Sequence, residues 1–118
     1  MILKNTFLAL SNILQAVEGN SAFGQLETES QAILKFIAAN EGSASEICVT
    51  DITNNGAIPG APATKLRRVH QLNSAGWIVL GKSDVHHRRI RLELSQMAKN
   101  EIANMSDDLK IHLRDLLN

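Results

Sequence analysis

The sequence is poor in cysteine and in aromatic residues. It has one cysteine, Cys48, and no tyrosine, and its aromatic residues are three phenylalanines and one tryptophan. A single cysteine cannot form a disulfide within the chain, which fits a reducing compartment. No apolar run approaches the roughly 18 residues of a transmembrane helix, and we find no signal-peptide pattern. We therefore expect a soluble cytoplasmic protein.

The signatures of common enzyme classes are also missing. The sequence has no Gly-rich phosphate loop, no nucleophile elbow and no metal-ligand spacing. His86 and His87 are adjacent, but neither a cysteine nor a helical i, i+4 histidine accompanies them as a further metal ligand. We therefore expect no catalytic residue, no cofactor and no metal.

Cys48 is expected to be a buried structural residue and not a peroxide sensor. Its neighbours are Ile47 and Val49, and carboxylates lie nearby at Glu46 and Asp51. Apolar and acidic surroundings disfavour the thiolate, which is the reactive form of cysteine.

What the sequence does contain is a strongly uneven charge distribution. The formal net charge is zero, yet residues 62–91 hold seven cationic residues against one acidic residue. The rest of the chain carries the compensating negative charge. A basic segment of this kind is the electrostatic footprint of a phosphate-binding surface, although an ordinary solvated face is the alternative for any charge run.

Two short helices are predicted before the basic segment. Residues 28–31 (TESQ) form a capping box, so a helix should start there and continue to Asn40. Gly42 should take the left-handed position that follows a helix. A second capping box at residues 43–46 (SASE) predicts another helix. Its inward residues should be Ile47, Cys48 and Ile52.

A third helix is predicted after a loop at residues 53–62, with Pro62 in its first turn. At about 100° per residue, its inner stripe should be Ala63, Leu66, Val69 and Leu72, with His70 and Asn73 as packing support nearby. The outward side chains should then be Thr64, Arg68 and Gln71, flanked by Lys65 and Arg67. These residue types hydrogen-bond base edges and phosphates, so we predict that they contact DNA.

A tight break at Ala75-Gly76 is predicted to end this helix, and a basic β-hairpin is predicted next, with strands at residues 77–80 and 89–94. In the second strand Ile90, Leu92 and Leu94 should share one face. The hairpin cations expected to hold phosphates or the minor groove are Lys82, Arg88, Arg89 and Arg91. A helix followed by a basic hairpin has the outline of a winged helix that grips DNA.

Both ends of the chain have the pattern of a long amphipathic helix with an apolar stripe, which we call an apolar seam. Residues 2–18 form an amphipathic helix whose stripe is Leu3, Phe7, Leu10, Leu14 and Val17. A second helical pattern runs from Ser95, and it either continues or restarts at Ser106. A central core of about 70 residues would struggle to cover both seams. Pairing with a second copy is therefore favoured over folding back onto the same chain.

The chain resembles the MarR-like winged helix-turn-helix transcriptional regulators over residues 26–105. The resemblance depends on Leu26-Glu27-Thr28 with Gln31 and Leu34, Ala63-Thr64 with Arg68 and Leu72, Ala75-Gly76-Trp77-Ile78, and Leu92-Glu93-Leu94-Ser95. Where that family usually carries an Asp-x-Arg motif in the wing, this chain has His86-His87-Arg88, with the acid displaced to Asp84.

The resemblance implies a homodimer formed by N- and C-terminal helices that binds palindromic operator DNA, often as a repressor released by a small ligand. We expect a mainly α (α+β) fold in a single domain, 1–118. Its parts would be an N-terminal helix (1–18), a winged helix-turn-helix core (26–95) and a C-terminal helical extension (96–118). The predicted function is a dimeric, sequence-specific DNA-binding regulator. The alternative is a non-catalytic winged-helix module that engages an acidic protein partner.

Overall fold

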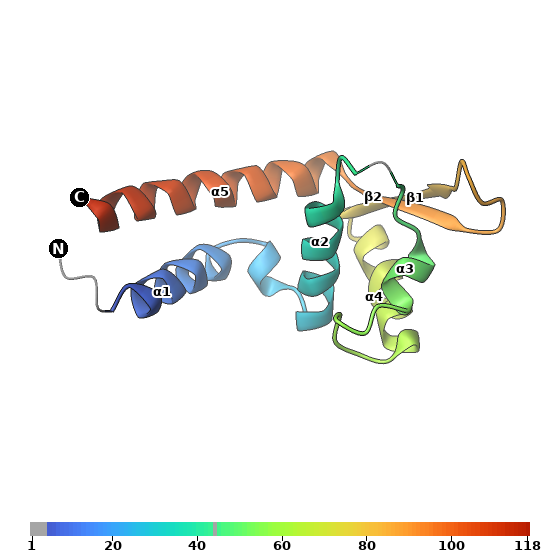
Figure 1. Ribbon diagram of the computed structural model, residues 1–118, viewed down its shortest axis with the longest axis horizontal. Helices are drawn as coiled ribbons and strands as arrows, with labels where there is room; N and C mark the ends of the chain where they lie inside the picture. The colour runs from blue at the N-terminus through green and yellow to red at the C-terminus, as the bar shows by residue number, and fades with distance from the viewer. Residues whose placement is uncertain (1–4, 44) are drawn as a thin grey trace. The chain divides into compact units, whose positions relative to one another are not determined.

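The computed structural model describes residues 5–43 and 45–118. It is mainly helical, with one two-stranded antiparallel sheet (Figure 1). In chain order the elements are α1 (Thr6–Gly19), the 3-10 helix η1 (Phe23–Gln25), α2 (Thr28–Asn40), α3 (Val49–Thr53), α4 (Pro62–Ser74), β1 (Ile78–Lys82), β2 (Ile90–Leu94) and α5 (Gln96–Leu117). None of the helices that the structure describes is both long and apolar enough to cross a membrane.

The chain divides into two compact units. The central unit, Glu27–Ala98, contains α2, α3, α4 and both strands. The terminal unit consists of Met1–Leu26 and Lys99–Asn118, and therefore holds α1, η1 and most of α5. Since α5 is one continuous helix, the C-terminal pattern does not restart at Ser106.

The core of the central unit is made by the inner faces of its helices and of the sheet. Its buried apolar side chains are Ile33, Leu34, Ile37, Cys48, Ile52, Ile58, Val69, Leu72, Trp77, Ile78, Leu92, Leu94 and Ala98. In the sheet, Ile78 pairs with Leu94 and Leu80 with Leu92. The predicted alternation of β2 is confirmed where the strand crosses the core, whereas Ile90 near the hairpin tip is 48% exposed.

The start of α2 differs from the prediction by one residue. Glu27 is the N-cap, in an extended conformation, and its side chain makes no capping hydrogen bond. Thr28 is already helical, so the predicted capping box is wrong. The end of α2 follows the prediction, because Gly42 has φ 84° and occupies the left-handed position beyond the helix.

The start of α3 is a larger correction, because the helix begins at Val49 and not near the predicted box at residues 43–46. The carbonyl of Ile47 accepts a hydrogen bond of 2.9 Å from the Leu92 amide, and Cys48 forms an isolated antiparallel bridge with Arg91. Pairing with β2 therefore keeps this segment extended. Residue 44, within the predicted box, lies outside the described residues.

A tight turn connects α4 to the sheet. The Trp77 amide donates to the Leu72 carbonyl over 2.9 Å, and the Gly76 amide donates to Asn73 over 3.2 Å. Gly76 has φ 85°. This is a Schellman motif, which turns the chain so that Trp77 is buried at the start of the hairpin. The predicted break at residues 75–76 is confirmed.

The terminal unit buries little of its apolar surface. Among its described residues, those that are buried are Val17 and Phe23. By contrast, Phe7 is 79% exposed and Leu14 is 47% exposed. The Ala22 amide donates to Glu101 Oε1 over 3.0 Å, which ties the α1–α2 connection to α5. Leu3, which was predicted for the same stripe, lies outside the described residues.

Candidate nucleic-acid interface

The orientation of α4 about its axis differs from the sequence expectation. Its buried residues are Lys65, Val69 and Leu72. Leu66, which was predicted to face inward, is 40% exposed. The other corrections are Ala63, His70 and Asn73, which are all exposed. At about 100° per residue, the side opposite the buried stripe carries Ala63, Arg67, His70 and Ser74.

Lys65 was predicted to contact DNA, but its side chain lies inside the central unit and is 3% exposed. Its ammonium donates to the carbonyl oxygens of Asn55 over 2.7 Å and of Ile58 over 3.3 Å. The alkyl stem is thus buried, while the ammonium makes charge-assisted hydrogen bonds to carbonyl groups of the loop that precedes α4. Lys65 therefore holds the loop that precedes α4 against the helix. The prediction that its side chain points outward was wrong.

Lys65→Met is expected to lower the free energy of unfolding by about 1.5 kcal/mol. Methionine keeps the buried stem but removes the donor to two carbonyl groups. Urea denaturation followed by circular dichroism measures the change. Lys82→Met makes the same substitution at an exposed lysine of the wing and should change stability little. Equal stability of the two variants would contradict the structural role of Lys65.

Arg68 bridges α4 to α2. Its Nε and Nη2 atoms each donate to Glu29 Oε1 over 3.4 Å, and its side chain is 17% exposed. Its Nη1 atom donates to Gln71 Oε1 over 2.9 Å. Glu27 adds a longer ion pair, at 3.8 Å. The guanidinium is therefore already occupied by carboxylate and amide oxygens in the free protein.

The remaining predicted residues of α4 differ in accessibility. Arg67 and Gln71 are exposed, whereas Thr64 is half-buried. Within the described part of the chain, Arg67 has no ion-pair partner. Of the two neighbouring arginines, Arg67 is thus the one whose guanidinium can reach another molecule without breaking existing contacts.

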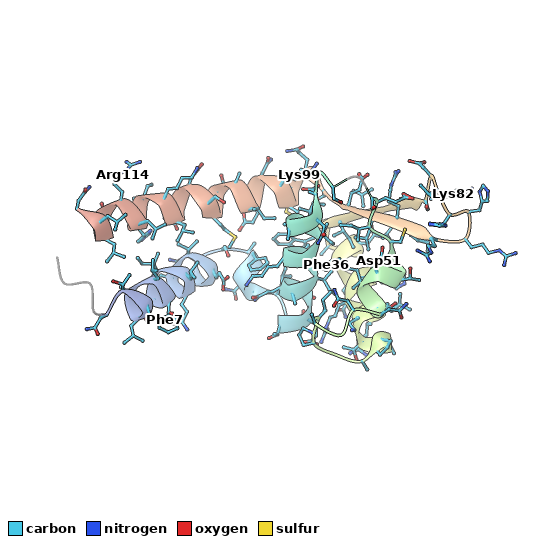
Figure 2. The ribbon with its side chains drawn as sticks, viewed as in Figure 1. Phe7, Phe36, Asp51, Lys82, Lys99 and Arg114 are labelled. Atoms are coloured by element: carbon cyan, nitrogen blue, oxygen red, sulfur yellow. The ribbon has the colours of Figure 1, made fainter. Side chains whose placement is uncertain are left out.

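The wing consists of β1, β2 and the residues between them, and we call residues 83–89 the wing tip. Figure 1 shows the wing extending beyond α3 and α4, and Figure 2 labels Lys82 on it. Lys82, Arg88 and Arg89 are exposed. Backbone hydrogen bonds order the tip: the Ser83 amide donates to the Arg89 carbonyl over 3.2 Å, and the Arg89 amide donates to the His86 carbonyl over 3.0 Å.

Arg91, the fourth predicted cation of the hairpin, is held by two carboxylates. Its Nη1 atom lies 2.9 Å from Asp84 Oδ2, and its Nε atom lies 3.5 Å from Glu93 Oε1. The displaced Asp84 thus braces the wing through an arginine further along β2. Arg91 is half-buried and stabilises the hairpin, so its side chain is less available to DNA than those of Arg88 and Arg89.

Glu46 is a further residue at this site, and sequence analysis had placed it in a capping box. It accepts a hydrogen bond from the Ser83 hydroxyl, and from the amides of Asp84 over 3.4 Å and Val85 over 3.3 Å. These donors, the Ser83 hydroxyl foremost, lower the pKa of the Glu46 carboxyl below its usual value. Glu46 is therefore ionised at neutral pH and hydrogen-bonded to the wing tip.

A groove of about 870 Å³ lies between the wing tip and the α2–α3 connection. Phe36 and Asp51, both labelled in Figure 2, line it together with Cys48 and Arg89. The Cys48 side chain is 2% exposed. Burial raises the pKa of the Cys48 thiol, and the carboxylates of Glu46 and Asp51 raise it further.

Cys48 is therefore expected to react slowly with thiol reagents in the folded protein. At pH 7.5, a roughly 100-fold faster reaction with a disulfide reagent in denaturant than in buffer would follow from burial and the raised pKa. Absorbance of the released thiolate measures both rates. A native rate equal to the denatured rate would contradict the structural assignment of Cys48.

No protein-family model matches the sequence, and no curated protein matches it either. The fold, however, is similar to many solved structures. Transcriptional regulator Tm0710 from Thermotoga maritima superposes with a TM-score of 0.69 at 13% identity, over 97% of this chain and 74% of that one. A mutant of MepR from S. aureus gives 0.68 at 14% identity, over 99% and 83%. MarR gives 0.56 at 18% identity, over 99% and 81%.

Each superposition covers at least 97% of this chain, and therefore includes both its helices and its antiparallel β-wing. At these identities the comparison establishes the fold. The chain has the winged-helix fold of the MarR-type transcriptional regulators.

Proposed function

We propose that this protein is a dimeric, sequence-specific DNA-binding regulator of the repressor type, without catalytic activity. The observation that carries the proposal is the exposed cationic surface of the central unit. Arg67 lies on the outer face of α4, and Arg88 and Arg89 lie on the wing tip of the same compact unit. A helix that enters the major groove beside a wing that follows the backbone is the docking geometry of winged helices. Such a regulator would act in the cytoplasm.

The proposed contacts fall into two groups. Arg67 and Gln71, with Thr64 at their edge, would read base edges in the major groove, because arginine pairs with guanine and glutamine with adenine. Lys82, Arg88 and Arg89 would hold phosphates or the adjacent minor groove. We leave Lys65 out of this set because it is buried.

Two predicted contacts receive a supporting role in this proposal. Arg68 would hold α4 against α2 through Glu29, and Arg91 would stiffen the wing through Asp84. Either residue could contact a phosphate only at the expense of an existing ion pair, which makes it a weaker candidate than an exposed neighbour.

The terminal unit supports the proposed homodimer. Its exposed large apolar side chains are Phe7, Leu8, Leu14, Ile111 and Leu117. Large apolar side chains that gather at a protein surface mark interaction sites. A second copy would cover them in an isologous interface and would supply a second recognition helix, so that the dimer matches a palindromic site.

Selection of binding sites from random duplex DNA, at two salt concentrations, tests this function. The expected result is a palindromic consensus whose affinity falls steeply as salt rises, because phosphate contacts release counterions. If no duplex sequence were enriched at low salt, sequence-specific DNA binding would be rejected. Retained binding of an acidic protein partner in its place would favour an interaction module.

A further inference from the structure

The wing tip is attached to the body of the central unit at one carboxylate. Three donors of the tip converge on Glu46: the Ser83 hydroxyl, the Asp84 amide and the Val85 amide. Since 37 residues separate Glu46 from Ser83, these bonds join distant parts of the chain. We call this group of hydrogen bonds the wing latch.

Ser83 connects Glu46 to the backbone of the wing tip. Its side chain is 8% exposed, and its Oγ atom accepts hydrogen bonds from the amides of Val85 over 3.2 Å and His86 over 2.9 Å. The hydroxyl thus donates to Glu46 while it accepts from the next turn. Its position therefore sets the path of the chain towards Arg88 and Arg89.

The base of the latch is itself fixed. The Cys48 amide donates to Asp51 Oδ2 over 2.8 Å, and the Ile47 carbonyl accepts from the Leu92 amide over 2.9 Å. The residues directly after Glu46 are thus held by both α3 and β2. A carboxylate on such a base can hold the wing tip in one orientation.

We propose that Glu46 is a positioning residue for DNA binding, which holds the wing tip so that Arg88 and Arg89 meet the DNA backbone. The proposal rests on the proposed function. Glu46 itself does not touch DNA in this arrangement. It acts through the hydroxyl and amide groups of the tip, and the arginines make the contact.

The direction in which DNA affinity changes when the Glu46 carboxylate is removed distinguishes this positioning role from a purely electrostatic effect. A negative charge beside a DNA-binding surface repels phosphates, so its removal alone should strengthen binding. Under the proposal, Glu46→Ala instead weakens binding about five- to tenfold, because charge-assisted hydrogen bonds to the tip are lost. Ser83→Ala should weaken binding in the same direction, although it leaves the charge unchanged.

A double-mutant comparison of Glu46→Ala with Arg88→Ala tests whether Glu46 acts through the wing arginines. In the otherwise unchanged protein, Arg88→Ala should weaken binding about tenfold and lower the salt slope by about one. In the Glu46→Ala background it should add less than about twofold, because the tip no longer presents the arginine. Fluorescence anisotropy with a selected duplex measures all four affinities. A role confined to overall stability would leave the effect of Arg88→Ala undiminished.

Amide hydrogen exchange of the free protein tests the latch without DNA. Glu46→Ala should speed the exchange of the Asp84, Val85 and His86 amides, while the amides of α5 remain unchanged. The control is Asp107→Asn, which removes one negative charge from an exposed position of α5 and leaves the latch and the Arg91 ion pairs in place. It should bind DNA as tightly as the unaltered protein or more tightly.

Different outcomes overturn different statements. Unaltered protein that binds no duplex at low salt would overturn the proposed function, and with it the role of Glu46 in DNA binding. Unaltered protein that binds, together with Glu46→Ala and Ser83→Ala variants that bind equally well or better, would overturn the latch alone. Unchanged exchange at the wing tip would overturn it as well.

Discussion

Phe7→Lys is expected to disrupt the proposed homodimer, leaving a monomer, and to weaken binding to a palindromic duplex by about 100-fold or more, because two linked half-site contacts become independent. Phe7 is 79% exposed, so the substitution removes little packing against the described residues of the same chain. In a twofold interface the phenyl ring would be buried twice, at about 1.5–3 kcal/mol for each ring. An ammonium group in its place would have to lose its hydration.

Light scattering at micromolar concentration and fluorescence anisotropy measure the two effects of Phe7→Lys. A duplex with a single half-site is the internal control, because its affinity should be unchanged if the central unit is intact. Asn12→Lys adds the same charge to α1 at a position about 140° around the helix from Phe7, and should remain dimeric. A dimeric mass for Phe7→Lys would reject this interface.

The turns of the central unit were predictable because their signals are local. Gly42 and Gly76 have φ of 84° and 85°, a region that glycine enters without steric cost. Pro62 stands at the start of α4, where its missing amide hydrogen costs nothing. Proline restricts its own backbone, and glycine permits a conformation that other residues avoid, so these local signals predict the ends of α2 and α4 and the start of α4.

The rotation of α4 could not be predicted, because its sequence fits two inner stripes that share Val69 and Leu72 and whose centres lie about 60° apart around the helix. Hydrophobic periodicity counts Lys65 as a surface residue. In the structure its stem is buried and its ammonium meets two carbonyl oxygens. The loop that supplies these carbonyls is ordered by tertiary packing of Ile58, which is 4% exposed, and no local pattern reports that packing.

The prediction for the segment before α3 was wrong for a related reason. A capping box is a local pattern, and residues 43–46 fit it. The decisive contacts come from elsewhere in the chain: Leu92 pairs with Ile47, and Ser83 reaches Glu46. Long-range pairing outweighs a local helix signal of this size, so the role of Glu46 became visible only in three dimensions.

Arg67→Ala is expected to weaken binding to the selected duplex by about 10- to 100-fold, which is the discrimination that one bidentate contact to a base provides. It should relax the preference at one base position and leave the melting temperature unchanged, because Arg67 is exposed. Arg68→Ala should behave differently. Loss of its contacts to Glu29 should lower stability by about 1–2 kcal/mol, with DNA affinity falling evenly across sequences.

The contrast between these neighbouring arginines tests which face of α4 meets DNA. Anisotropy with duplexes varied at single positions measures base preference, and thermal unfolding measures stability. Lys110→Ala removes an exposed cation from α5 and controls for net charge. If Arg68→Ala relaxed the base preference while Arg67→Ala had no effect, α4 would dock through the face predicted from the sequence. Arg68 would then have to exchange its ion pair with Glu29 for a base, an exchange whose cost should appear as tighter binding by Glu29→Gln.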